Sequence, residues 1–168
     1  MRRILIWIAA IIVLILALLL LIYVTLFAGR SEGTRIGATS TTFRIFGPND
    51  KVAIDRFDDD EIAGVACYLA RARKGGVPGA VGTAEDPSEL SLSCARGPVV
   101  TVKPGTNLAD ANGERVFSER ASILFKTIDV RRYYDKERKT LCYLVISTKL
   151  INGSPTNATS CINIEDAK

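Results

Sequence analysis

Residues 123–150, ILFKTIDVRRYYDKERKTLCYLVISTKL, decide the fold class of this chain. Two long runs rich in β-branched and aromatic residues, 123–134 and 141–150, flank the polar segment 135–138. Runs of this composition that are separated by a short turn are typical of an antiparallel hairpin. The stretch therefore predicts a pair of long neighbouring β-strands.

Shorter segments elsewhere have the same character. Residues 90–94 alternate apolar and small polar side chains with a period of two, as a half-buried strand does. The turn residues of 47–50 separate two further runs, 41–46 and 51–57, which predicts a second hairpin. Other strands are expected at 65–71, 99–103, 115–119 and 158–164, and short helices only at 58–64 and 84–90. We expect an all-β fold, an antiparallel sandwich or a partly open barrel with one or two short helices.

The N-terminal segment has a different composition. Residues 4–28 contain no charged side chain, and a helix of that length would measure about 37 Å, more than the roughly 30 Å of a bilayer core. Arg2 and Arg3 precede it, so the positive-inside rule places the N-terminus in the cytoplasm. The run exceeds the roughly 7 to 15 apolar residues of a signal peptide, but a cleaved signal remains the alternative. The sequence predicts a single N-terminal transmembrane helix.

These features divide the chain into three parts. Residues 1–28 are expected to form the membrane anchor, 29–40 a linker rich in Gly, Ser and Thr, and 41–168 the β domain. Without Arg2 and Arg3 the chain has 20 basic and 18 acidic residues, which is not the charge balance of a nucleic-acid-binding protein.

All four cysteines, Cys67, Cys94, Cys142 and Cys161, follow the N-terminal segment, and an even number suits an oxidising compartment. Four cysteines permit three pairings, and the neighbouring predicted strands favour Cys67 with Cys94 and Cys142 with Cys161. Register counted about residues 152–153 puts Cys161 nearly, but not directly, opposite Cys142. The chain has no histidine and no CxxC, so no metal site is expected.

A series of short motifs resembles the CreA family of bacterial envelope proteins, from about Thr39 to Ile164. One residue is missing between Cys94 and Gly97, and Cys142 and Cys161 lie outside the family pattern. The resemblance implies a periplasmic domain without an established activity. The motifs are Phe43-x-x-Phe46-Gly47-Pro48-x-Asp50-Lys51, Phe57-Asp58-Asp59, Gly64-Val65-x-Cys67-Tyr68, Arg71-Ala72-x-Lys74-Gly75-Gly76, Ala84-Glu85-Asp86, Ser93-Cys94, Gly97-Pro98, Leu124-Phe125-Lys126, Tyr134-Asp135 and Gly153-Ser154-Pro155-x-Asn157.

The absence of histidine excludes Ser-His-Asp and Cys-His mechanisms, and no Walker A, dinucleotide or GxSxG motif is present. Carboxylates of the kind used by glycosidases occur at Glu85, Asp86 and in the run 58–61. Adjacent carboxylates are more often solvated surface charge, so we expect no catalytic residue and no cofactor.

Residues 71–82 contain the strongest signal for ligand binding. Arg71, Arg73 and Lys74 stand beside Gly75 and Gly76, and glycine allows successive backbone N–H groups to converge on an anion. An anionic envelope ligand, such as a phosphorylated headgroup or a cell-wall polymer, fits this composition. The alternative is a long connection between strands that needs glycine for its backbone conformation.

The sequence thus predicts a membrane-tethered periplasmic binding or interaction module. The protein would be a single-pass protein of the inner membrane, with its N-terminal helix in the bilayer and its β domain in the periplasm. A structural or regulatory partner of another membrane protein is the alternative, and an enzyme that uses Glu85 and Asp86 is the least favoured hypothesis.

Overall fold

The computed structural model describes residues 2–27, 33–80, 84, 89–108, 111–122, 126–151 and 154–167. The chain forms two compact units, residues 1–30 and residues 31–168. Helix α1, Arg2–Phe27, lies in the first unit, and all the strands lie in the second.

The predicted transmembrane helix is not supported. Across the described part of the chain, no helix combines the length and the apolar character needed to cross a membrane. This part of the predicted fold class is therefore wrong.

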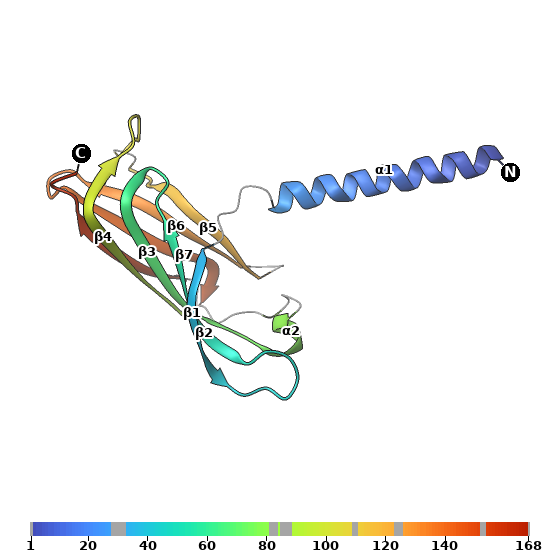
Figure 1. The fold of residues 1–168 in the computed structure, drawn as a ribbon, viewed down its shortest axis with the longest axis horizontal. Coiled ribbons are helices and arrows are strands. Elements are labelled where there is room, and N and C mark those ends of the chain that lie inside the picture. The colour runs from blue at the N-terminus through green and yellow to red at the C-terminus, as the bar shows by residue number, and fades with distance from the viewer. Residues whose placement is uncertain are drawn as a thin grey trace. The chain divides into compact units, whose positions relative to one another are not determined.

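The second unit consists of two antiparallel four-stranded sheets, with strand orders β1-β2-β3-β4 and β5-β6-β7-β8 (Figure 1). The all-β prediction is thus confirmed. The first sheet contains β1 Thr34–Thr42, β2 Asp50–Asp58, β3 Ile62–Arg73 and β4 Leu90–Val102. The second contains β5 Glu114–Ser122, β6 Lys126–Asp135, β7 Thr140–Ile151 and β8 Ser154–Asn163.

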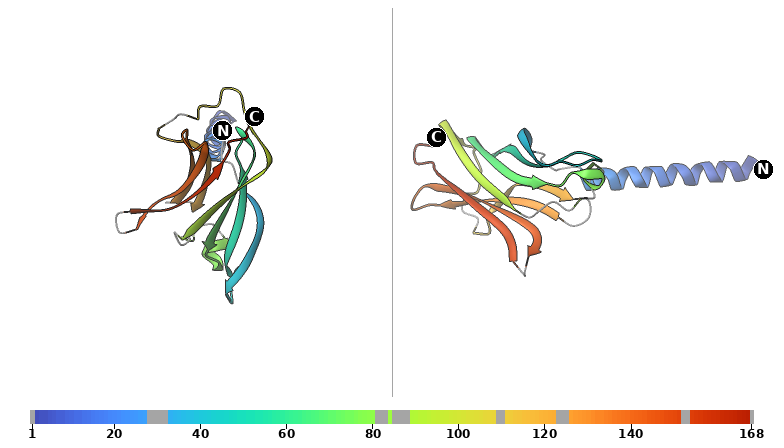
Figure 2. Two further views of the ribbon diagram at one scale, coloured as in Figure 1. Left: turned by 90° about the vertical axis from the view of Figure 1, so that its left-hand side faces the viewer. Right: turned by 90° about the horizontal axis from the view of Figure 1, so that it is seen from below.

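The two sheets form separate layers around one core (Figure 2). On β7, alternate side chains from Leu141 to Ser147 are buried, because successive residues of a strand point to opposite faces. The rings of Phe57 on β2 and Phe117 on β5 stack across the core with centroids 4.6 Å apart. The sheets approach each other at β4 and β8, where the Cys94 N–H donates to the Ser160 Oγ at 2.8 Å.

The hairpin predicted at 41–57 exists, but its first strand lies earlier than expected. Strand β1 occupies most of the segment 29–40 that was expected to be a linker, and residues 43–49 connect it to β2. Every side chain of β1 is exposed. The strand therefore has no alternation of apolar residues, and only its backbone pairing with β2 defines it.

The helices also differ from the expectation. Helix α2, Gly76–Ala80, lies in the glycine-rich segment, whereas the predicted helix at 58–64 is a tight turn between β2 and β3. Residues 85–88 of the other predicted helix lie outside the described residues. The strands predicted at 90–94 and 99–103 are one strand, β4, which bulges opposite Gly64. A proline is tolerated at such a bulge, so Pro98 does not end β4.

Both disulfides have the pairing that the sequence predicts. Cys67 on β3 is bonded to Cys94 on β4, and Cys142 on β7 to Cys161 on β8. Cys142 and Cys161 are direct register partners, contrary to the expected offset. A register shift between Ile146 and Leu150 moves β8 relative to a count from the turn, which explains the difference.

We predict that removing either disulfide destabilises the domain by a similar amount. The bridges close loops with sequence separations of 27 and 19 residues, and chain entropy gives about 3 kcal/mol for each. Urea denaturation of the C67S/C94S and C142S/C161S variants measures the two losses. Unchanged midpoints in both variants would contradict a structural role for the bridges.

Candidate functional site

Two of the three cations of the predicted anion site, Arg71 and Arg73, form ion pairs inside the protein. The Nη2 atom of Arg71, on β3, donates to Asp55 Oδ2 on β2 at 3.0 Å and also to Glu119 on β5. Arg73 donates to the same two carboxylates, at 3.2 Å and 3.0 Å. Arg35, on β1, completes this group through an ion pair with Asp55. We call these five residues the Asp55 cluster.

The electrostatics of the Asp55 cluster favour an ionised Asp55. Burial by itself would raise the pKa of this carboxyl, but hydrogen bonds from Arg35 and Arg71 and their positive charges outweigh it, so the pKa is lowered. The Nη1 atom of Arg71 is buried and has no hydrogen-bond partner among the described residues. The two arginines nevertheless serve mainly to bind internal carboxylates.

The backbone amides of the glycine-rich segment also have internal partners. The Gly75 N–H donates to Asp50 Oδ1 at 2.7 Å, and the Gly76 N–H donates to the Pro48 carbonyl at 2.6 Å. The segment therefore holds an anion, but that anion is the carboxylate of Asp50. Lys74, which precedes Gly75, is exposed. Binding of an external anion here stays a prediction, and Glu85 and Asp86 lie outside the described residues.

These contacts fix the connection between β1 and β2. Arg44 donates to Asp50 Oδ2 at 2.7 Å, and its backbone N–H donates to Asn49 Oδ1 at 2.9 Å. The hydrogen bonds from Arg44 and from the Gly75 amide lower the pKa of Asp50. Gly47 has a φ of 82° and lies so close to Gly76 that a Cβ on it would be 2.4 Å from the Gly76 carbonyl carbon. The connection is therefore braced from inside.

The same connection displays large apolar side chains to solvent. Phe43, Ile45 and Phe46 are 80%, 82% and 76% exposed, and Val77 on α2 is 58% exposed. We call these four residues the apolar tip. Exposed apolar surface of this kind marks interaction sites in folded proteins, especially where a polar framework holds it in place.

Apolar surface continues from the tip onto the outer face of the first sheet. Val52 and Ile54 on β2 are exposed there, because they alternate with the inward-facing Ala53 and Asp55. A shallow hollow of about 270 Å³ lies alongside, lined by Val52, Ala70, Arg71, Ala72, Glu89, Leu90 and Ser91. The exposed apolar area is thus larger than the connecting loop alone.

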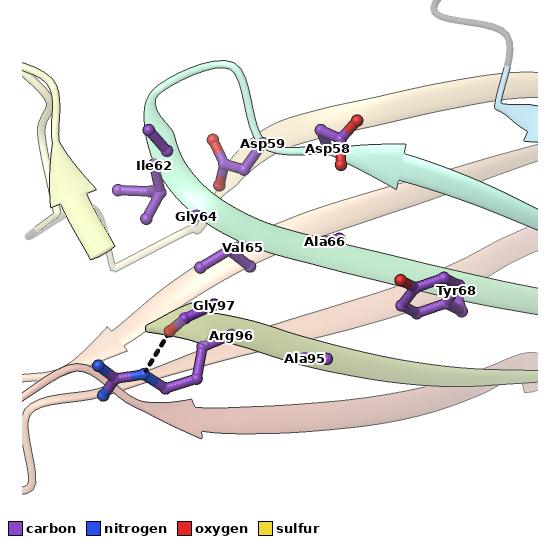
Figure 3. Close-up of a pocket in the computed structure, with 11 residues that line it drawn as sticks. Asp58, Asp59, Ile62, Gly64, Val65, Ala66, Tyr68, Ala95, Arg96 and Gly97 are labelled. Carbon is purple, nitrogen blue, oxygen red and sulfur yellow. Dashed lines mark hydrogen bonds between the residues drawn. The ribbon is translucent and has the colours of Figure 1, made fainter. Parts of the chain in front are cut away.

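A second hollow, of about 430 Å³, lies over β3 and β4 (Figure 3). Its floor consists of small residues such as Gly64, Ala66 and Ala95, and Tyr68 and Arg96 lie toward opposite ends. The charged groups at its rim are already paired, since Arg96 binds Asp166 at 2.6 Å and Asp58 lies 3.5 Å from Arg56. We therefore place the candidate functional site at the apolar tip.

Two carboxylates of the run 58–61, Asp59 and Glu61, belong to a second ionic group. We call it the Asp59 cluster, and it also contains Glu114, Arg132 and Tyr143. Both Asp59 oxygens accept from Arg132 Nη1 at 2.8 Å, and Tyr143 donates to Asp59 Oδ2 at 2.9 Å. Glu61 and Glu114 accept from Arg132 Nη2 at 2.6 Å and 2.7 Å.

Burial and the neighbouring carboxylates shift the pKa values of two groups in the Asp59 cluster. Burial and the nearby Asp59 charge raise the pKa of Tyr143. The pKa of Glu114 is also raised, by partial burial and by its carboxylate neighbours, in spite of Arg132. Within the described ranges, no three potential ligands lie together as a metal would need. Asp59 and Glu61 are ion-pair partners of Arg132 in the structure.

The predicted anion-binding segment and the apolar tip are neighbours in the structure. Gly75 and Gly76 hold the connection through Asp50 and Pro48. Three of the exposed residues of the tip lie in 43–46, which the sequence predicts as part of a strand beside the turn at 47–50. The motif Phe43-x-x-Phe46 was a signal in the resemblance, although burial cannot be deduced from it.

The chain has clear relatives. A sequence model of the family described as CreA protein matches residues 36–167. Protein CreA of Escherichia coli strain K12 is 37% identical over 134 residues, which cover 80% of this chain and 85% of that protein. Protein CreA of Escherichia coli O157:H7 has the same identity over the same share of both chains. No solved structure matches the chain.

We predict that Asp55→Asn lowers the free energy of unfolding by about 3 kcal/mol at neutral pH, because it removes one of the two carboxylates that pair with the buried Arg71. A carboxyl with a lowered folded pKa stabilises the protein above the unfolded pKa of about 4, and this contribution is lost as the pH falls through the folded pKa. The difference between wild type and variant should therefore narrow in acid.

Denaturation at neutral pH and at about pH 3 measures this difference. The control is Glu165→Gln, whose carboxylate is 72% exposed and 3.7 Å from Lys139, and which should change stability by less than about 1 kcal/mol. A loss for Asp55→Asn that is constant over the whole pH range would refute the ionic explanation.

We also predict that Gly75→Ala disturbs the apolar tip. A Cβ at this position would be 1.9 Å from the Pro48 carbonyl oxygen, so the connection has to move away from α2. Chymotrypsin should then cleave after Phe43 or Phe46 faster than in the wild type. The matched control is Gly37→Ala, because nothing lies within 4 Å of a Cβ at that position. Equal rates of cleavage in the two variants would show that the contact of Gly75 with the connection does not hold the tip in place.

Proposed function

The chain belongs to the CreA family, a family without an established biochemical activity, and we propose that it is a binding or interaction module of the bacterial envelope. The apolar tip is the surface through which it engages its partner. One observation carries this proposal: Phe43, Ile45 and Phe46 are at least three-quarters exposed in a connection that the protein itself holds in place.

The hydrogen bonds that hold the connection support recognition, because they reduce the conformational entropy that would be lost on binding. A connection that is already fixed by Asp50, Gly75 and Gly76 loses little conformational freedom when a partner covers it. The Gly75 and Gly76 amides bond to groups within the protein, so the exposed apolar side chains are the groups that a partner would contact. Burial of a phenylalanine side chain contributes roughly 1.5–3 kcal/mol, so burial of Phe43 and Phe46 would make a favourable contribution to the free energy of binding.

The periplasm is the compartment that suits this module. Disulfides form and persist in oxidising compartments such as the bacterial periplasm, and Cys67–Cys94 and Cys142–Cys161 account for all four cysteines. A structural or regulatory contact with another membrane protein is the alternative role, and it would use the same surface.

Photo-crosslinking in living cells tests the proposal. With p-benzoylphenylalanine in place of Phe46, we expect an adduct with a cell component, and the additional change Phe43→Ser should weaken it. The matched control places the same amino acid at Val99 on β4, which is 57% exposed. Val99 lies beside Gly64, near the start of β3, whereas the tip lies near its end. Equal adducts at both positions, or none at Phe46, would reject the tip as an interaction surface.

A stability measurement separates binding from folding. The F43S/F46S variant should keep the free energy of unfolding within about 0.5 kcal/mol of the wild type, because both side chains are exposed. A loss of several kcal/mol would mean that the two rings belong to the core of the domain.

A further inference from the structure

We propose that the partner of the apolar tip is the surface of a lipid bilayer that carries anionic headgroups. This inference rests on the proposed function and names the partner of the same site. It concerns residues of the β domain and does not involve α1.

The form of the tip favours a bilayer over a protein partner. The connection 43–49 and α2 lie together at one end of the first sheet (Figure 1). A stable protein interface covers about 800 Å² on each partner and some 20–30 residues, whereas the tip consists of four large exposed side chains. Interfacial insertion needs only apolar side chains that reach the boundary between headgroups and acyl chains.

The charges around the tip favour an anionic surface. Residues 43–52 and 73–80 contain four basic side chains and a single acidic one, Asp50. Arg73 is paired inward with Asp55 and Glu119. The cations beside the tip are therefore Arg44, Lys51 and Lys74. The side chain of Arg44 remains 43% exposed although it pairs with Asp50. Cations beside an inserted apolar group are attracted to anionic headgroups at short range, which is the arrangement of a peripheral membrane site.

The apolar face of β2 fits the same geometry. Val52 and Ile54 extend the apolar surface away from the tip on the outer face of the sheet. With the tip inserted, these side chains would lie next to the headgroup layer and would also leave water. A second copy of the chain could cover the same strip, so the experiment has to distinguish the two occupants.

Fluorescence of one tryptophan at the tip tests the inference in the full chain. Trp7 is the only tryptophan, so the W7F/F46W variant reports on the tip alone. Vesicles with lipids brominated in their acyl chains quench a tryptophan that enters the bilayer. The matched control is W7F/V99W, and because α1 is the same in both variants, any binding by residues 1–30 contributes equally.

We expect quenching of W7F/F46W on vesicles of equal parts phosphatidylglycerol and phosphatidylcholine, and little quenching of W7F/V99W. Partitioning should be about tenfold weaker on pure phosphatidylcholine, since several cations face the surface. Equal quenching of the two variants, or equal partitioning on both vesicles, would overturn the inference.

Two further outcomes separate this inference from the proposed function. A blue shift of W7F/F46W that depends on protein concentration without vesicles would identify a second copy of the chain as the occupant. A protein adduct from the crosslinker at Phe46, without quenching by vesicles, would leave the interaction module intact and reject the bilayer. Failure of both experiments would reject both proposals.

Discussion

The buried ion pair between Arg132 and Asp59 crosses from one sheet to the other, and the rest of the domain depends on it. Both side chains are almost fully buried, and Arg132 donates to both Asp59 oxygens at 2.8 Å. A buried pair adds little net stability against an apolar substitute, but breaking it leaves an unpaired buried charge. Arg71 makes the corresponding link through Glu119. The two links fix how the sheets align around Phe57 and Phe117.

The two sheets repeat one topology, which the sequence does not reveal as a repeat. Each is an antiparallel four-stranded sheet whose third and fourth strands in chain order are joined by a disulfide. The fourth strands, β4 and β8, are also where the sheets meet. The disulfides therefore stiffen the strands on either side of this contact, while the ionic clusters link the first sheet to β5 and β6.

Strands with period-two burial were predictable, because β3 and β7 expose one face and bury the other. Strand β1 was not, since pairing with β2 defines it and its side chains carry no burial pattern. The same limit applies to the site. Local composition identified Arg71 to Gly76, but their partners Asp50, Asp55 and Glu119 come from other strands, and only the fold brings them together.

The distribution of these interactions explains how the domain tolerates an exposed apolar tip beside an exposed edge strand. An edge strand with unpaired backbone groups invites association with other chains. Strand β1 carries register shifts between Arg35 and Gly37 and between Ser40 and Thr42, and such irregularities interrupt a continuous edge. The Arg35 ion pair with Asp55 also ties the strand inward. These features make β1 a poor template for pairing with another chain. The domain can therefore expose the apolar tip to a binding partner without also offering a regular strand edge for aggregation.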